Sequence, residues 1–367
     1  NVRGAGELFL PIVAGGLVYL MARVGGLTKI VYSQNIMSGD WLAINNQPNA
    51  TVTLDLSLDL SNPTIAYTTE GGQAINIYRN TTINTGTWET ILDTSGFVTL
   101  TSISLPPLAG RGFNLSLIHS VIGATGLIAF YAVARDDSAY CHAYALHSHD
   151  NGDSWTAVEL LNNAETGSGI RDRPRLVITT VDATIIYVLT YNNGTTDFEL
   201  HRSNDQGHTF IRVDDGDIAS ANVYAVANPS GDAASLYLYD FDLWRSVDNG
   251  VNHTLINNTF ESILLNLITS DGVKLVGSDR STLIAISTNS GVSWTTAIVS
   301  TGPQIMALAS IRSGLYVAAQ AGLPNNARVF TFGDSLIETD VTGNLLTALG
   351  GNPALILSLV VPEMAIP

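Results

Sequence analysis

The fold of this chain is decided by the stretch Ser148-His149-Asp150-Asn151-Gly152-Asp153-Ser154-Trp155, because three related stretches follow it. These are Ser203-Asn204-Asp205-Gln206-Gly207-His208-Thr209-Phe210, Ser246-Val247-Asp248-Asn249-Gly250-Val251-Asn252-His253 and Ser287-Thr288-Asn289-Ser290-Gly291-Val292-Ser293-Trp294. All four follow the pattern Ser-x-Asp/Asn-x-Gly-x-Ser/Thr/Asn-aromatic. We call them turns 1 to 4, in chain order.

Each turn lies between two β-rich runs, which is the sequence signature of a β-hairpin. An Asp or Asn side chain at such a turn accepts hydrogen bonds from backbone amides two residues further on, and glycine adopts positive φ without steric cost. The aromatic side chain buries apolar surface beside the turn. We therefore expect structural and not catalytic roles for the pattern residues. They are Ser148, Asp150, Gly152, Trp155, Ser203, Asp205, Gly207, Phe210, Ser246, Asp248, Gly250, Ser287, Asn289, Gly291 and Trp294.

The spacing of turns 2 to 4 is roughly forty residues, which is the period of a four-stranded propeller blade. Two strand-like runs precede each turn, and the N-terminal part repeats this layout with eroded turns that end in Trp41 and Trp88. The pattern resembles the Asp-box, or BNR repeat, family of β-propellers. We therefore expect an all-β propeller of about seven four-stranded blades, with six or eight as alternatives. The units start near Glu7, Val52, Phe113, Arg175, Asn222, Glu261 and Gln304.

The whole chain, 1–367, is expected to form one propeller domain, with 342–367 as a C-terminal extension. The apolar run 354–361 either closes the ring by pairing with the N-terminal blade or pairs with a neighbouring subunit. The chain begins with Asn1 and not with Met, so either a leader has been removed or the record begins inside the gene product. The apolar stretch 8–22 fits strands of the first blade better than a signal segment, because Pro11, Gly15 and Gly16 interrupt it.

The charge pattern excludes some functions. The net charge is -16 and no basic patch is present, so we expect no nucleic-acid binding. No apolar run reaches the roughly 18 residues of a membrane-spanning helix. Charged residues make up only 13% of the chain, about half the usual share. Two explanations stay open: much of the surface is buried against copies of the same chain, or a large β core raises the apolar fraction.

Few residues suggest a catalytic or ligand-binding role. The alternation around Asp55, Ser57 and Asp59 indicates either a site in the central channel or, as we favour, a solvated strand face. Cys141 is the only cysteine, so no intrachain disulfide is possible. Five histidines gather around turns 1 and 2, but we see no ligand spacing, so we predict no metal site and no cofactor. They are His142, His147, His149, His201 and His208.

Asp-box propellers include sialidases, and a sialidase-like site needs three arginines that hold a carboxylate. The nearest set is Arg171, Asp172, Arg173 and Arg175, which follows turn 1, whereas the family places its arginine segment before the first box. These four residues are weak catalytic candidates, and we favour a polar loop. Sequons allow surface glycans without demanding them. They begin at Asn49, Asn80, Asn114, Asn193, Asn252 and Asn257.

We therefore expect a non-enzymatic, extracellular or virion-surface protein with a structural or adhesive role. It would assemble with itself into a homo-oligomer, filament or lattice, or bind surface glycans or a protein partner through the propeller faces. The first alternative is a glycoside hydrolase of the sialidase type, and the second is a soluble assembly factor that binds one protein partner.

Overall fold

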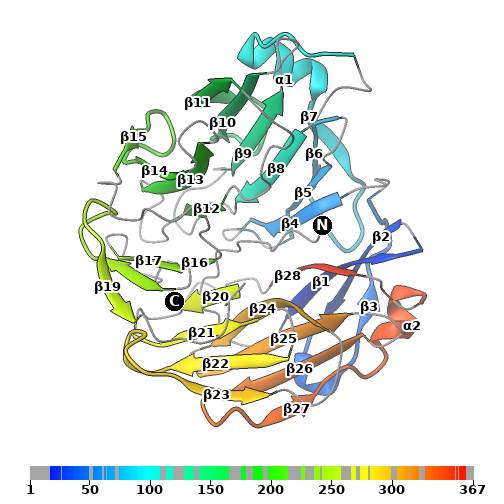
Figure 1. Ribbon diagram of the computed structural model, residues 1–367. Coiled ribbons are helices and arrows are strands. Elements are labelled where there is room, and N and C mark those ends of the chain that lie inside the picture. Colours follow the sequence, from blue (N-terminus) through cyan, green and yellow to red (C-terminus); the bar gives the residue numbers. More distant parts are fainter. Residues whose placement is uncertain are drawn as a thin grey trace.

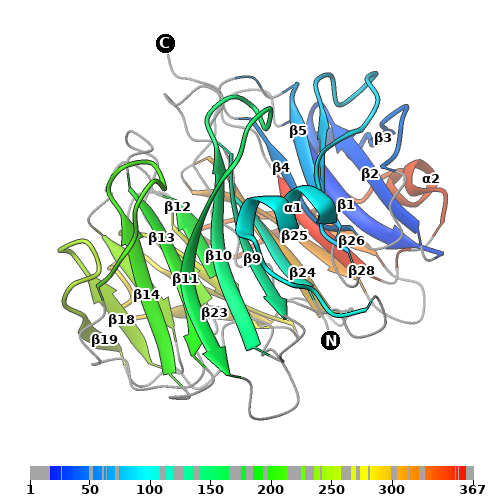
Figure 2. The same ribbon diagram turned by 90° about the horizontal axis from the view of Figure 1, so that it is seen from above.

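The computed structural model is mostly β, which confirms the all-β prediction (Figures 1 and 2). It describes residues 17–25, 27–48, 53–59, 62, 64–70, 74–107, 113–118, 128–135, 140–164, 175–178, 185–192, 197–213, 225–227, 235–239, 242–257, 266–269, 273–279, 282–298, 304–312, 314–321, 327–351, 353 and 355–360. Within these residues the strands form seven antiparallel sheets of four strands each. Figure 1 shows the sheets arranged around a common centre.

Six sheets are made of strands that follow one another in the chain, and the bounds below run outward from the innermost strand. They are β4 (Thr53–Leu58), β5 (Ala66–Glu70), β6 (Asn76–Asn80) and β7 (Glu89–Asp93); β8 (Phe113–Ile118), β9 (Ile128–Arg135), β10 (Tyr140–Ser148) and β11 (Thr156–Ala164); β12 (Arg175–Ile178), β13 (Ile186–Asn192), β14 (Asp197–Ser203) and β15 (Ile211–Arg212); β16 (Ala225–Ala227), β17 (Leu236–Tyr239), β18 (Leu243–Ser246) and β19 (Thr254–Asn257); β20 (Asn266–Thr269), β21 (Leu275–Ser278), β22 (Leu283–Ser287) and β23 (Thr295–Ile298); β24 (Gln304–Arg312), β25 (Leu315–Ala321), β26 (Arg328–Gly333) and β27 (Glu338–Asp340).

The seventh sheet joins both ends of the described chain. Its order is β28 (Leu355–Val360), β1 (Val18–Val24), β2 (Leu27–Ser33) and β3 (Leu42–Ala43). β28 runs antiparallel to β1, from Tyr19 opposite Val360 to Arg23 opposite Leu355. β28 also contacts β24 on one side and β4 on the other. The innermost strand of this sheet therefore comes from the far end of the chain. The first strand that the sequence suggested before residue 16 lies outside the described residues.

Burial falls from the inner strands to the outer ones. All four residues of β17 and all four of β21 are buried, whereas both residues of β3 and both of β15 are exposed. An inner strand is covered on both faces by neighbouring sheets, so continuous apolar sequence suits it. The outermost strand has a sheet neighbour on one side only.

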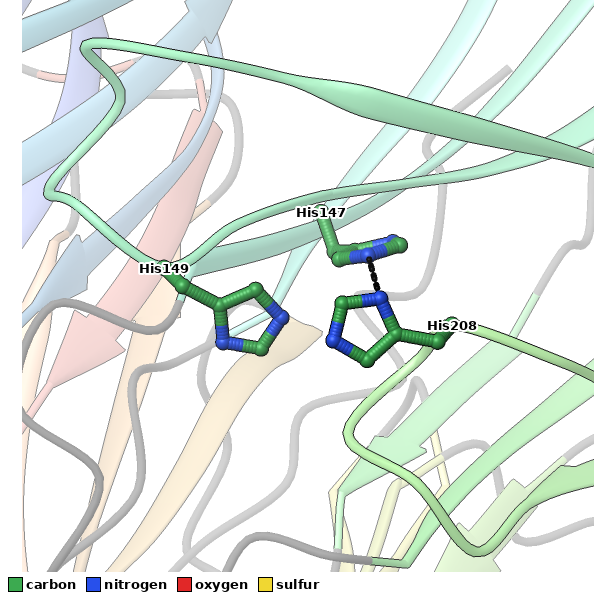
Figure 3. Close-up of side chains that lie close together, drawn as sticks. All are labelled: His147, His149 and His208. Carbon is green, nitrogen blue, oxygen red and sulfur yellow. Dashed lines mark hydrogen bonds between the residues drawn. The ribbon is translucent and has the colours of Figure 1, made fainter.

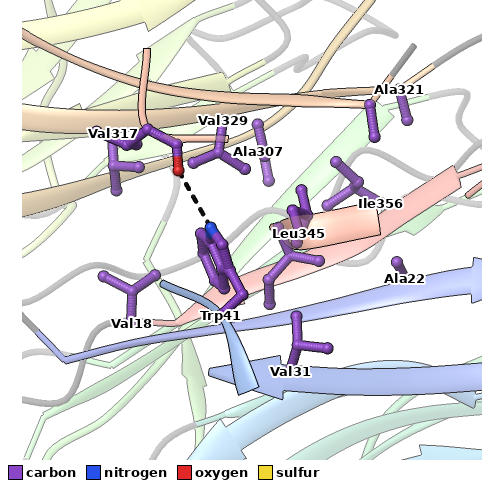
Figure 4. Close-up of a cluster of buried hydrophobic side chains, with 14 of the residues drawn as sticks. Val18, Ala22, Val31, Trp41, Ala307, Val317, Ala321, Val329, Leu345 and Ile356 are labelled. Atoms are coloured by element: carbon purple, nitrogen blue, oxygen red, sulfur yellow. Dashed lines mark hydrogen bonds between the residues drawn. The ribbon is translucent and has the colours of Figure 1, made fainter. Parts of the chain in front are cut away.

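Trp41 anchors the seventh sheet to the C-terminal part (Figure 4). Its side chain is buried, and its indole nitrogen donates to the carbonyl oxygen of Val341 at 3.1 Å. The Asn344 side chain accepts from the Trp41 amide at 2.6 Å and donates to the Trp41 carbonyl at 3.1 Å. Val18 and Leu345 pack in the same cluster. These contacts connect residues from opposite ends of the chain.

Three short helices in the described segments are an addition to the all-β fold that the sequence predicted. They are η1 (Ile36–Ser38), α1 (Thr94–Thr101) and α2 (Leu345–Leu349). Asp93 caps α1 by accepting a hydrogen bond from the Gly96 amide at 2.7 Å, and Phe97 is the buried residue of this helix. No helix in the described part of the chain is long and apolar enough to cross a membrane.

Candidate functional site

The four turns share one hydrogen-bond network. The Ser hydroxyl donates to the Asp or Asn Oδ1 at 2.7–3.0 Å and accepts from the Gly amide at 2.8–2.9 Å. The same Oδ1 accepts from the amide four residues further on at 2.8–2.9 Å. The side chain thus spans the whole turn, whereas the sequence analysis expected a bond to the amide two residues on. It is the Ser hydroxyl that accepts from the amide two residues on, at 3.2–3.4 Å.

These hydrogen bonds make the turn carboxylates unusually acidic. The hydroxyl and amide of Ser154 lower the pKa of Asp150 to about 2. The side chain and amide of Asn252 lower the pKa of Asp248 to about 2 as well. At Asp205, burial acts in the opposite direction, but the hydrogen bonds from Thr209 prevail and the pKa is again about 2. The three carboxylates are therefore ionised and fully used as acceptors within their turns.

Each turn also packs on the sheet before it. In turn 1, Asn151 and Gly152 have φ of 60° and 94°, and the other three turns repeat this pair of positive angles. A Cβ atom at Gly152 would overlap the Ile91 side chain of β7. Trp155 donates from its indole nitrogen to the Ile91 carbonyl at 3.2 Å. The turns therefore fasten neighbouring sheets as well as closing their own hairpins.

In three of the sheets, the penultimate residue of the third strand reaches toward the turn of the next sheet. Arg79 of β6 donates to the Asn151 carbonyl of turn 1 at 2.7 Å and pairs with Asp153 at 2.9 Å. Arg202 of β14 donates to the Asn249 carbonyl of turn 3 at 3.0 Å. We use the name junction for such a contact between a third strand and the turn of the next sheet. At the junction of turns 1 and 2, this position is occupied by His147 and not by an arginine.

His147 meets two other histidines at this junction (Figure 3). It is the penultimate residue of β10, directly before turn 1, while His149 lies in turn 1 and His208 lies in turn 2 of the next sheet. The Nε2 atom of His147 is 3.3 Å from the Nδ1 atom of His208. One ligand nitrogen from each ring lies within 4.8 Å of the others. The His147 ring stands at 77° to His149 and 88° to His208, whose own planes differ by 13°.

The environment of the cluster favours the neutral imidazole at His147 and at His149. Burial, followed by the charges of His149 and His208, lowers the pKa of His147 to about 4. Burial and then His208 also lower the pKa of His149. His147 is buried, and its Nδ1 atom has no hydrogen-bond partner, whereas His149 and His208 are exposed. The cluster thus brings the ring nitrogens of one buried and two exposed histidines close together, two of them joined by a hydrogen bond.

The sequence analysis named these histidines but predicted no metal site. His142 and His201, which it named with them, lie apart: His142 pairs with Glu159 at 2.6 Å and His201 with Glu199 at 3.5 Å. The remaining three belong to two hairpins that are far apart in sequence. Their approach depends on how one sheet packs on the next, and the linear spacing carries no sign of it.

The other predicted sites have different outcomes. Arg171, Asp172 and Arg173 lie outside the described residues, and Arg175 begins β12. Asp59 is buried just after β4 and accepts from the Asn62 amide at 3.2 Å, so the prediction of a solvated face is wrong at this residue.

The sequon prediction is wrong at Asn80. This side chain is fully buried, accepts from the Thr82 amide at 2.9 Å and donates to the Gly86 carbonyl at 3.1 Å, so it cannot carry a glycan in the folded chain. Asn252 is exposed, but its amide nitrogen donates to Asp248 at 2.6 Å. Asn49 and Asn193 lie outside the described residues. For Asn114 and Asn257 only the backbone, in β8 and β19, is described.

No known family model matches the chain, and no curated protein matches it in sequence. Among solved structures, it is similar to the β-propeller domain of the Trilobed protease from Pyrococcus furiosus, with a TM-score of 0.52, 13% identity, and coverage of 91% of this chain and 96% of that one. It is also similar to YCF48 from Cyanidioschyzon merolae, with a TM-score of 0.50, 12% identity, and coverage of 79% and 84%. The fold is therefore a β-propeller.

Proposed function

We propose that this protein is a non-catalytic propeller of the Asp-box type that associates with copies of itself through its outer strands. Each of the seven sheets is one blade, β28 closes the ring against β1, and residues 1–367 form a single domain. Turns 1 to 4 are the boxes. Their carboxylates are occupied by hydrogen bonds inside the turns, which supports a structural role for them.

The observation that carries the proposal is that four of the seven outermost strands each expose a large apolar side chain. We use the name apolar rim for Leu42 in β3, Ile211 in β15, Leu255 in β19 and Ile298 in β23, which are all exposed. Ile298 is the most exposed of these, at 78%. The outermost strand of each sheet also has backbone donors and acceptors on its outer side that no strand of its own sheet pairs.

A second copy of the chain fits this surface better than a charged partner. An edge strand binds another strand through backbone hydrogen bonds, and apolar side chains on both partners add buried area. The low share of charged residues, 13%, leaves few charges that must lose water at such a contact. The net charge of -16 opposes association at long range, but physiological salt screens that repulsion. We propose an extracellular or virion-surface setting for the resulting oligomer, filament or lattice.

Light scattering and electron microscopy of the purified protein at increasing concentration test the proposal. The wild-type protein should form oligomers or ordered assemblies at physiological salt, and Ile298→Lys together with Ile211→Lys should shift it to the monomer. Leu27→Lys is the matched control, because Leu27 is 54% exposed, like Ile211 at 53%, but lies in β2. A strict monomer at every concentration would contradict self-assembly and would favour the alternative of a single protein partner.

The enzymatic alternative, a glycoside hydrolase of the sialidase type, rests on Arg171, Arg173 and Arg175. Turnover of fluorogenic glycosides that is abolished by Arg173→Ala would support it and would overturn the non-catalytic proposal. Retention of glycans on an array without turnover would instead support the adhesive form of the proposal.

A further inference from the structure

We propose that His147, His149 and His208 together bind one divalent transition-metal ion of the zinc class, which links turn 1 to turn 2. This site is independent of self-assembly, because it lies at a junction between sheets and not on the apolar rim.

The spacing of the ring nitrogens fits such an ion. Two nitrogens bound at about 2.05 Å to a tetrahedral ion lie roughly 3.3 Å apart. The separation between His147 Nε2 and His208 Nδ1 is 3.3 Å. The third ligand nitrogen lies within 4.8 Å, and the exposed His149 side chain has two rotatable bonds with which to approach. Figure 3 shows the His149 and His208 rings facing the same small space beside His147.

The neighbouring junctions show what is unusual here. Where Arg79 and Arg202 occupy the position before the turn, a cationic donor meets an acceptor, either a carbonyl oxygen or the Asp153 carboxylate. At the His147 junction, a histidine meets two histidines. A metal ion satisfies the three nitrogen lone pairs at once.

The surroundings supply further support. Asp205 acts electrostatically on His147 and His208, and Asp150 acts on His149, so negative charge surrounds the cluster. Both carboxylates are held by their own turns and act as fixed charges. A Cβ atom added at Gly207 would lie 3.3 Å from the His147 ring, so this ring lies close to turn 2. The exposed side of the cluster leaves room for a water molecule as the fourth ligand, the arrangement typical of open three-histidine sites.

The donor set selects the class of ion. Imidazole nitrogen suits Zn²⁺, Ni²⁺, Cu²⁺ and Co²⁺, whereas Mg²⁺ and Ca²⁺ prefer oxygen ligands. The bound ion would connect the β10–β11 hairpin to the β14–β15 hairpin. The expected role is therefore a cross-link between adjacent sheets.

The test is a titration of untagged, chelator-treated protein with Co²⁺, followed by visible absorption, and then displacement by Zn²⁺. One equivalent of Co²⁺ should give the absorption bands of a tetrahedral site, and Zn²⁺ should remove them. His208→Asn and His149→Ala should each weaken binding by roughly tenfold or more. Both residues are exposed, so both variants should fold. His142→Asn is the control, since His142 lies on β10 but outside the cluster, and it should bind as the wild type does.

Thermal unfolding gives a second, independent readout. Excess Zn²⁺ should raise the melting temperature of the wild type and of His142→Asn, because an ion that binds only the folded state stabilises it. His208→Asn should show no such rise. If the wild type binds no Co²⁺, or if His208→Asn binds it equally well, the proposal is wrong and the three rings form only a hydrogen-bonded contact.

Discussion

Turns 1 and 2 differ from turns 3 and 4 in what they present to solvent, although all four have the same backbone. The second and sixth positions hold His149 in turn 1 and His208 in turn 2, whereas turn 3 holds Val247 and Val251 and turn 4 holds Val292. These valines are exposed. The Ser, Asp or Asn, and Gly positions keep the same hydrogen bonds throughout. The same hydrogen-bonded frame therefore carries different exposed side chains, histidines in turns 1 and 2 and valines in turns 3 and 4.

The largest expected effect comes from breaking the frame itself. Gly291→Ala should destabilise the fold by about 3 kcal/mol, because φ is 87° and the added Cβ would overlap the Leu243 side chain. Gly25→Ala is the control: its φ is 58°, but no atom lies within 4 Å of the added Cβ, so we expect about 1 kcal/mol. Denaturant unfolding measures both. Equal costs would show that the turn does not pack on the preceding sheet as described.

The next prediction compares two substitutions at Asp150, one that removes the whole side-chain acceptor and one that removes only its charge. Asp150→Ala should cost about 1–2 kcal/mol, because the Ser154 amide and hydroxyl lose their acceptor. Asp150→Asn should cost only about 0.5 kcal/mol. Turn 4 already contains Asn289, whose amide nitrogen donates to Ser293 at 2.9 Å. Equal losses in the two variants, measured by urea unfolding, would contradict the equivalence of turns 1 and 4.

Lowering the pH should also distinguish the Asp residues of turns 1 to 3 from an Asn at the same position. The pKa values of Asp150, Asp205 and Asp248 are lowered to about 2 in the folded state, below the unfolded value near 3.9. Their stabilisation is therefore complete above about pH 4 and is lost as the pH falls toward 2. The triple variant with Asn at all three positions should lose stability less steeply between pH 4 and pH 2, as followed by circular dichroism. An unchanged slope would mean that other carboxylates govern acid unfolding.

The smallest effect on stability should come from exchanging one kind of junction for another. The double variant His147→Arg/His208→Asp recreates the pairing of Arg79 with Asp153. We expect its unfolding free energy to stay within about 1 kcal/mol of the wild type, whereas His147→Ala alone should cost about 2 kcal/mol. Co²⁺ binding should disappear in the double variant. Retained binding would place the metal elsewhere in the chain.

The sequence predicted most of what is local. The turn residues are close in the chain, so the pattern from Ser148 to Trp155 indicated a hairpin that the hydrogen bonds of turn 1 also describe. Helix α1 was missed because its eight residues are too few for a clear period, and its main signal is the Asp93 cap. The burial of Asn80 was missed because it depends on a turn without the box pattern.

Contacts between segments that are distant in the sequence could not be predicted. The meeting of His147 with His208 requires the packing of two hairpins whose contact has no signature in either one. The same holds for β28: its apolar sequence favoured pairing within its own chain but also fitted pairing with a neighbouring subunit. Only the three-dimensional structure places it beside β1, with residues that lie at the other end of the chain.

The pairing of β28 with β1 has a consequence for biosynthesis. While the protein is being synthesised, β1 and Trp41 remain without partners that lie about 300 residues further along the chain. A contact between segments so distant in sequence forms slowly, because the whole intervening chain has to be ordered or looped out first. During that interval the nascent protein exposes an unpaired apolar strand, which makes the unfinished ring the stage at which chaperone protection would matter most.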